Sequence, residues 1–234
     1  MIFSSVDQLK KAIEGILKIE GDNVRVLDEK RLRGSLIDHL VYSAVLSGDA
    51  GVRQAARWLI RRAGVTLGVL PSSIQSLYEA MGRGDVKGFT VPAINIRGLT
   101  YETAQAVFRA GLKGKVGPII FEIARSEIGY TEQRPDEYAC AITAAAVKTG
   151  WRGPLFLQGD HFQIGVKKFA AEPQKEVESV KELVREAIEA GFYNIDIDSS
   201  TVVDLSKPTE EEQQRSNFTI AADITAFIRR IQPR

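Results

Sequence analysis

A repeating alternation of short apolar runs and longer amphipathic stretches occupies the chain from Phe89 onward. Each apolar run is typical of a buried parallel strand, and each is followed by apolar residues at helical spacing. The predicted strands cover residues 89–96, 117–124, 154–158 and 193–197, and the predicted helices cover about 100–112, 135–148, 173–190 and 210–231. Four consecutive βα units predict an α/β fold with a parallel sheet buried on both faces.

The first 87 residues have a different pattern, which predicts helices separated by short breaks. Ser5 is placed to cap the first helix, and Pro71 is placed to begin the last. The apolar positions that define these helices include Leu9, Ile13, Ile16, Leu17, Leu36, Leu40, Val52, Leu59, Ile74 and Leu77. Residues 82–88 hold three glycines and no periodicity, so we predict a helical region at 1–87 and an α/β region at 88–234.

Composition and charge exclude several classes of protein. The 234 residues carry 31 basic and 30 acidic side chains, interleaved along the chain, so no basic face for nucleic acid or a membrane surface is expected. No apolar run is long enough to span a membrane, and the N-terminus lacks the pattern of a signal peptide. The single cysteine, Cys140, lies in an apolar helical pattern and is expected to be buried. We therefore expect a cytoplasmic protein.

The segment LFLQGDHFQ, residues 155–163, is the strongest functional signal in the chain. Asp160 and His161 fall where the third predicted strand should end, which is the edge where α/β proteins gather their catalytic groups. Histidine binds metals, and a neighbouring aspartate can donate or accept a proton. The alternative is a structural hydrogen-bonded pair. The other histidine, His39, lies among apolar residues and is expected to be packed or at the surface.

Two further carboxylates lie on the fourth predicted strand. Asp196 and Asp198 share one face, because side chains alternate along a strand. Two carboxylates on a buried strand need a metal, an arginine or hydrogen bonds. Two interpretations stay open at this point: pairing with an arginine, or a cation held between these residues and His161.

The segments VPAINIRGLTYETAQAVFRAG, GPIIFEIARSE, LFLQGDHF and DIDSSTVVDLS, taken in order, resemble the first half of class II, zinc-dependent ketose-bisphosphate aldolases. The resemblance covers about residues 89–232. It implies a TIM-type (β/α)8 barrel, of which this chain would hold the first four βα units. It also implies reversible cleavage of fructose or tagatose 1,6-bisphosphate into dihydroxyacetone phosphate and glyceraldehyde 3-phosphate.

The resemblance also assigns roles to residues. His161 would be a ligand of a catalytic Zn²⁺, and Asp160 would transfer the proton of the hydroxyl group that becomes the aldehyde. Asn95 and Ser126 would bind substrate. Asp204 would belong to an auxiliary site for a second divalent or a monovalent cation.

The chain departs from this family at several points. A catalytic zinc normally has three protein ligands, whereas the chain has two histidines and only His161 falls in the α/β region. A complete barrel needs eight strands, and Ala124 stands where many relatives have a serine. The leading hypothesis is a metal-dependent aldolase with half of its site in this chain, acting on phosphorylated ketoses and trioses as a homo-oligomer. The alternatives are a non-catalytic partner subunit of a tagatose-bisphosphate aldolase complex, an inactive truncated fragment, or a half-barrel that dimerises.

Overall fold

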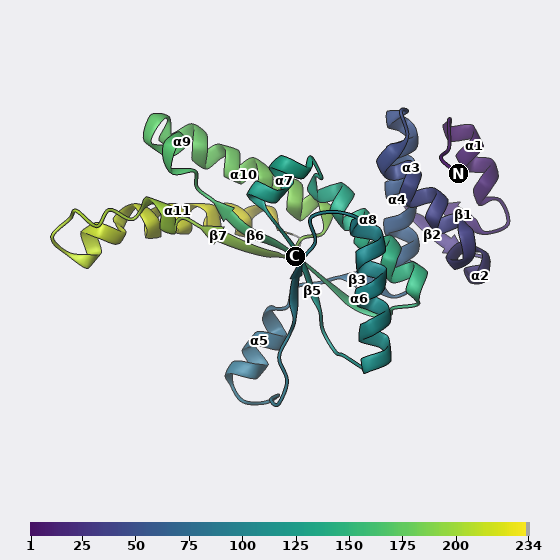
Figure 1. Ribbon diagram of the computed structural model, residues 1–234, viewed down its shortest axis with the longest axis horizontal. Helices are drawn as coiled ribbons and strands as arrows, with labels where there is room; N and C mark the ends of the chain where they lie inside the picture. The colour runs from purple at the N-terminus through teal and green to yellow at the C-terminus, as the bar shows by residue number, and fades with distance from the viewer. Residues whose placement is uncertain (233–234) are drawn as a thin grey trace.

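The computed structural model describes residues 1–232 and contains a five-stranded parallel sheet (Figure 1). β4 (Ala93–Asn95), β5 (Ile120–Ala124), β6 (Gly153–Gln163) and β7 (Asn194–Asp198) lie side by side in the order of the sequence. β3 (Val69–Pro71) pairs with the first three residues of β6. The predicted α/β fold with a parallel sheet is therefore confirmed.

The main helices follow the strands in the same order and form one layer. α6 (Thr100–Gly114), α8 (Pro135–Thr149), α10 (Pro173–Ala190) and α11 (Glu210–Ile231) pack as successive neighbours. Two short helices, α7 (Arg125–Thr131) and α9 (Val166–Ala171), follow β5 and β6. Strands that advance in one direction through crossovers of one hand place all their helices on the same face. One face of the sheet is thus buried against helices.

The opposite face is covered only in part, in contrast to the prediction. A small apolar cluster of Ile74, Ile120 and Phe156 lies there, beside α5 (Gln75–Gly82). Further along the strands this face carries polar side chains. The sequence predicted burial of both faces because the apolar runs are continuous, but several of their residues pack on α5 rather than on a second helical layer.

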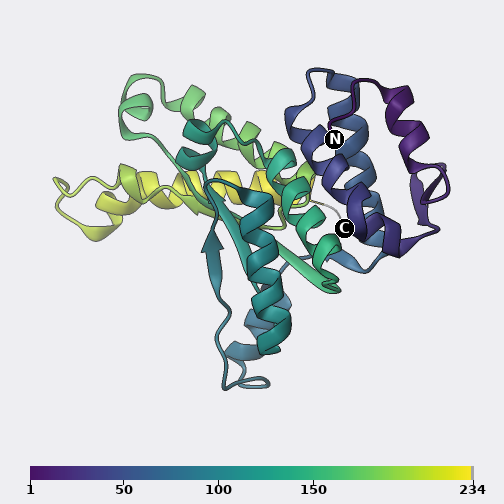
Figure 2. The ribbon, with the colours of Figure 1, turned by 45° about the vertical axis from the view of Figure 1, so that its right-hand side comes forward.

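The N-terminal region packs at one end of the molecule, against α8 (Figures 1 and 2). Arg57 bonds to Asp136 and Glu137 of α8, and Lys148 of α8 bonds to Asp38. Cys140 of α8 is fully buried, as expected. The elements of the region are α1 (Val6–Ile13), β1 (Leu17–Glu20), β2 (Asn23–Val26), α2 (Glu29–Arg31), a π-helical turn (Leu32–Leu36), α3 (Ile37–Leu46) and α4 (Ala50–Thr66).

Two helical predictions in this region were wrong. The first helix ends at Ile13, and Leu17 belongs to an antiparallel hairpin whose two-residue turn has Gly21 at positive φ. Pro71 ends a strand, and α5 begins only at Gln75. Isolated apolar residues next to a turn fit either helix or strand, and pairing with a partner strand decided the outcome.

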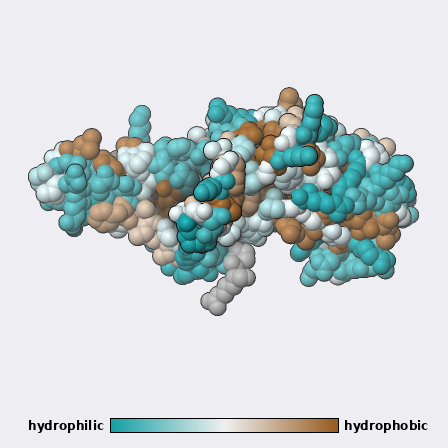
Figure 3. Space-filling model, turned by 90° about the horizontal axis from the view of Figure 1, so that it is seen from below, coloured by the Kyte–Doolittle hydropathy of each residue, from teal (hydrophilic) through white to brown (hydrophobic). Residues whose placement is uncertain are grey.

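Two edges of the sheet have no strand partner within residues 1–232: β4 forms one, and β3 and β7 form the other. The described residues therefore form an open sheet, and closure into a barrel stays a prediction. Seen from below, the surface shows several apolar patches among polar side chains (Figure 3). Within the described part of the chain, no helix is both long and apolar enough to cross a membrane.

β6 contains a bulge at Asp160 and His161, which corrects the prediction that these residues lie at the end of the strand. Gly159 pairs with Ile195 and Phe162 pairs with Ile197, so two residues of β6 lie opposite one residue of β7. His161 has φ +42°, in the left-handed region. The bulge returns Phe162 to the helical side, where its ring is fully buried. The strand therefore continues past the polar pair to Gln163.

Gly159→Ala is expected to destabilise the fold by about 1–3 kcal/mol, because overpacking of a filled core costs this much. A Cβ at this position would lie 2.5 Å from the buried ring of Phe162. The measurement is the free energy of unfolding in urea. Gly129→Ala is the matched control, since a Cβ there meets nothing within 4 Å and the change should stabilise α7 by up to about 1 kcal/mol. Equal stability of the two variants would contradict the packing described for the bulge.

Candidate functional site

A polar face is formed where the strands approach their carboxyl ends. Because side chains alternate along each strand, residues at every second position point away from the helices. The register pairs Asn95 with Glu122 and Glu122 with Gln158, so the polar side chains form a row across the sheet. The row and its extension along the strands consist of Asn95, Glu122, Gln158, Asp160, Asp196 and Asp198.

The imidazole of His161 is oriented by Asp198. The Nδ1 atom lies 3.2 Å from Oδ2 of Asp198, which also accepts a hydrogen bond of 2.6 Å from Gln163. Burial opposes ionisation of Asp198, but hydrogen bonds from Ser200, Gln163 and His161 outweigh it and lower the pKa to about 2. An ionised Asp198 favours the tautomer that carries its proton on Nδ1. The Nε2 lone pair then remains free, 3.8 Å from Oδ1 of Asp160.

Asp160 is held from the other side by an amide. The Nδ2 atom of Asn95 donates to Oδ2 of Asp160 and to Oε2 of Glu127, both at 3.0 Å. Glu127 is buried, and it also accepts the backbone N–H of Ala124 at 2.8 Å and pairs with Nε of Arg97 at 2.7 Å. This network fixes one oxygen of Asp160 and leaves the other facing His161.

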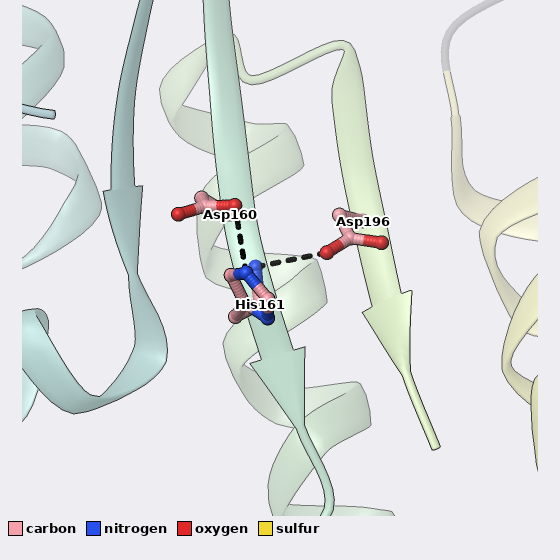
Figure 4. Close-up of side chains that lie close together, drawn as sticks. All are labelled: Asp160, His161 and Asp196. Atoms are coloured by element: carbon pink, nitrogen blue, oxygen red, sulfur yellow. Dashed lines mark hydrogen bonds and ion pairs between the residues drawn. The ribbon is translucent and has the colours of Figure 1, made fainter. Parts of the chain in front are cut away.

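Asp196, on β7, is the third member of the group. Its carboxylate accepts the backbone N–H of His161 at 3.1 Å, a bond that the bulge makes possible. One donor atom each from Asp160, His161 and Asp196 lies within 4.8 Å of the others (Figure 4). An imidazole nitrogen with two carboxylate oxygens is a donor set that suits Zn²⁺ and similar divalent cations.

Glu122 is the most buried carboxyl group of the row. Burial raises its pKa, and the nearby negative charges of Asp160 and Glu127 raise it further. Gln158 donates a hydrogen bond of 2.8 Å to Oε2 of Glu122. The carboxyl group therefore keeps its proton to higher pH than an exposed glutamate, which lowers the total negative charge of the polar face.

The structure brings together some of the predicted site residues and separates others. Asn95, Asp160 and His161 lie in one connected group. Ser126 is exposed in the first turn of α7. Asp204 lies in the loop before α11, where Oδ1 accepts hydrogen bonds from the backbone and hydroxyl of Ser206. The group of metal-ligating atoms found in the described residues consists of Asp160, His161 and Asp196, and the auxiliary cation site at Asp204 stays a prediction.

Sequence reasoning assigned no role to Arg97 and Glu127. The available signal was a glutamate shortly after a predicted strand, together with an arginine after the preceding strand. The bonds of Glu127 to Asn95 and to Arg97 are seen only in the three-dimensional structure. His39, by contrast, is only partly exposed and packs edge-on against Phe3, as expected for a packed histidine.

A cavity of about 700 Å³ runs along the free edge of β7. Gln158 and Asp196 of the polar face line one side, and Tyr78 of α5 and Ile228 of α11 are among the other residues that line it. A volume of this size accommodates a small ligand. The cavity reaches Asp196, whereas Asp160 and His161 lie on the open rim beside it.

No protein-family model matches the chain, and neither the curated proteins nor the solved structures that were compared with it gave a match. The resemblance to class II aldolases stays a prediction from the sequence segments quoted above.

The pKa values of the two histidines should be shifted in opposite directions from the ordinary value for histidine. The hydrogen bond to Asp198, with the charge of Asp160, raises the pKa of His161, whereas burial lowers the pKa of His39. Because its pKa is raised on folding, protonated His161 stabilises the fold below about pH 6.5, and this contribution is lost as the pH rises through the raised value.

The measurement is an NMR titration of the two imidazole rings in metal-free protein. Asp198→Asn should lower the pKa of His161 and leave that of His39 unchanged. If the His161 titration does not move in this variant, Asp198 does not orient the ring in solution.

Proposed function

We propose that the protein is a metal-dependent aldolase that reversibly cleaves a ketose 1,6-bisphosphate into dihydroxyacetone phosphate and glyceraldehyde 3-phosphate. Fructose 1,6-bisphosphate is the first candidate substrate. The observation that carries the proposal is the group formed by His161, Asp160 and Asp196 on the polar face of the parallel sheet, in which β4 to β7 follow the order of the sequence. The proposed architecture is a (β/α)8 barrel in which β4 to β7 are the first four strands, since sequential parallel order is that of such a barrel.

The side chains fit a divalent cation on two grounds. First, a ring nitrogen of His161 and a carboxylate oxygen of Asp196 lie within 4.8 Å of each other, and an oxygen of Asp160 lies within the same range as the proton-transferring group. Second, the contact between Nδ1 of His161 and Asp198 is the carboxylate–histidine arrangement that commonly supports a metal-bound imidazole. His161 and Asp196 would hold the cation, and further ligands would come from outside this group.

The residues of the chain divide the chemistry between them. A bound divalent cation supplies Lewis-acid stabilisation of the negative charge that aldol cleavage develops on the ketose oxygen. Asp160 removes the hydroxyl proton of the substrate, the electrons of that O–H bond form the aldehyde, and the adjacent C–C bond breaks. The electron pair of the C–C bond passes to the ketose carbonyl as an enediolate, which takes up a proton from solvent at carbon to give dihydroxyacetone phosphate. In the condensation direction Asp160 returns the proton. Asn95, through its bond to Oδ2, directs the other oxygen of Asp160 toward the reacting hydroxyl.

A non-catalytic partner subunit is the second candidate, and Ala124 favours it. Ala124 lies on the polar face, opposite Asp160 in the register, where it offers no hydroxyl group to a substrate carbonyl. A partner subunit would retain the hydrogen-bonded network for structural reasons. Zinc binding without any cleavage of fructose or tagatose 1,6-bisphosphate by the full-length protein would favour this candidate.

Zinc affinity distinguishes the residues of the proposed metal site. His161→Ala should weaken Zn²⁺ binding by more than the roughly 10- to 100-fold that loss of an outer-sphere partner costs, and Asp198→Asn should fall within that range. Asp196→Asn should also weaken binding. Asp204→Asn is the matched control and should bind zinc as the unmodified protein does, because its carboxylate lies in a separate loop.

The measurement is competition with a chromophoric zinc chelator at constant pH. Retention of zinc by His161→Ala would exclude the proposed site. Loss of zinc by Asp204→Asn would instead place the cation at the auxiliary position that the sequence resemblance implies.

Asp160→Asn should retain zinc and lower the rate of cleavage by about 10²- to 10⁴-fold, the usual contribution of a general acid or base. The side chain keeps its shape and can still bond to Asn95, so the fold should be unaffected. The measurement is the rate of triose phosphate release by the full-length protein. An unchanged rate would rule out proton transfer by Asp160, and simultaneous loss of zinc would make Asp160 a ligand.

A further inference from the structure

Arg97 occupies an unusual position at the β4 end of the polar rim. Its Nε atom pairs at 2.7 Å with Glu127, whose side chain is only 9% exposed, whereas 62% of the Arg97 side chain is exposed. A buried acid therefore holds an arginine that remains largely in solvent. The closest contact uses Nε, so the outer part of the guanidinium presents N–H donors at the surface.

The anchoring of Glu127 makes this arginine part of the site. One oxygen of Glu127 accepts from Asn95 and from the backbone of Ala124, which leaves the other oxygen for Arg97. The same Asn95 amide bonds to Asp160. Arg97 is therefore linked to Asp160 through two side chains, each fixed by hydrogen bonds, and its position depends on the same network.

The neighbouring arginine is not available in this way. Arg125 follows β5, but its guanidinium bonds to the buried Glu176, to the backbone oxygen of Gln163 and to Ser179. Most other side chains of the polar face are carboxylates. Those of the proposed metal site, Asp160 and Asp196, lie on β6 and β7. The rim thus has an exposed arginine at β4, and the carboxylates of Asp160 and Asp196 lie two and three strands away.

We propose that Arg97 binds a phosphate group of the substrate and that Glu127 is the residue that positions it. This inference rests on the proposed function and adds the anion contact of the same site. The planar guanidinium suits a phosphate group because its N–H donors form paired hydrogen bonds with two oxygens. β4 and β6 are two strand spacings apart, roughly 10 Å, so the phosphate lies to one side of the metal group and the sugar chain extends between them.

The test is the affinity of the full-length protein for glycerol 3-phosphate, measured by isothermal titration calorimetry with and without zinc. This phosphate monoester has no carbonyl group and cannot undergo aldol cleavage. Arg97→Gln should weaken its binding by about tenfold or more, as expected for loss of charge-assisted hydrogen bonds. Arg97→Lys keeps the charge and loses the paired donors, so its affinity for glycerol 3-phosphate should lie between those of the unmodified protein and Arg97→Gln. Zinc affinity should be the same in all three proteins.

Arg152→Gln is the matched control. Arg152 is 60% exposed and pairs with Glu29 at 2.9 Å, far from the polar face. This variant should bind glycerol 3-phosphate as the unmodified protein does, and uncharged glycerol should bind to none of them.

Two results would overturn the inference. If the unmodified protein binds glycerol 3-phosphate no better than glycerol, the rim holds no phosphate site. If Arg97→Gln lowers the free energy of unfolding but leaves the affinity unchanged, Arg97 serves only to neutralise Glu127. A different result would reject the proposed function alone. If the protein cleaves no ketose bisphosphate but binds glycerol 3-phosphate through Arg97, the phosphate site stands and the aldolase activity is excluded.

Discussion

The bulge in β6 determines which side chains reach the polar face. In a regular strand, neighbouring residues point to opposite sides, so Asp160 and His161 would be separated and Phe162 would point away from the helices. The extra residue places Phe162 in the core, where it is fully buried, and leaves both Asp160 and His161 on the rim. His161 adopts a left-handed conformation that costs about 1–3 kcal/mol for a residue of its type. Burial of the Phe162 ring over Gly159 offsets this cost.

The network around the bulge separates carboxyl groups of different character. Asp198 receives hydrogen bonds from three side chains and stays ionised, whereas Glu122 is buried beside other acids and retains its proton more readily. Asp160 lies on β6, the strand between those of Glu122 and Asp198, and its Oδ2 atom accepts a hydrogen bond from Asn95. Environments that push neighbouring carboxyl groups apart in pKa are typical of sites that perform acid–base chemistry.

Much of the fold could be predicted from local sequence, because α8 and α10 begin at proline and end at glycine with positive φ. The hairpin β1–β2 was missed because Ile16 and Leu17 continue the helical spacing of α1, although LKIE and NVRV alternate on either side of Gly21. For the site, Asp160 and His161 could be identified as neighbours of a strand end. The bond between Asp196 and the backbone of His161 could not, because it depends on the extra residue in β6, and nothing in the local sequence specifies a bulge.

The composition of the polar face limits what can cover it. Acidic side chains of β5, β6 and β7 lie on a surface whose apolar part is confined to the cluster beside α5. A dry apolar layer placed over these groups would leave charges without compensation, at a cost of several kcal/mol for each ion. Any structure that pairs with the free edges of β4 and β7 must therefore keep this face hydrated or supply cations. An acidic sheet face with an arginine at one side is poorly suited to a structural core and well suited to binding a metal and an anionic ligand together.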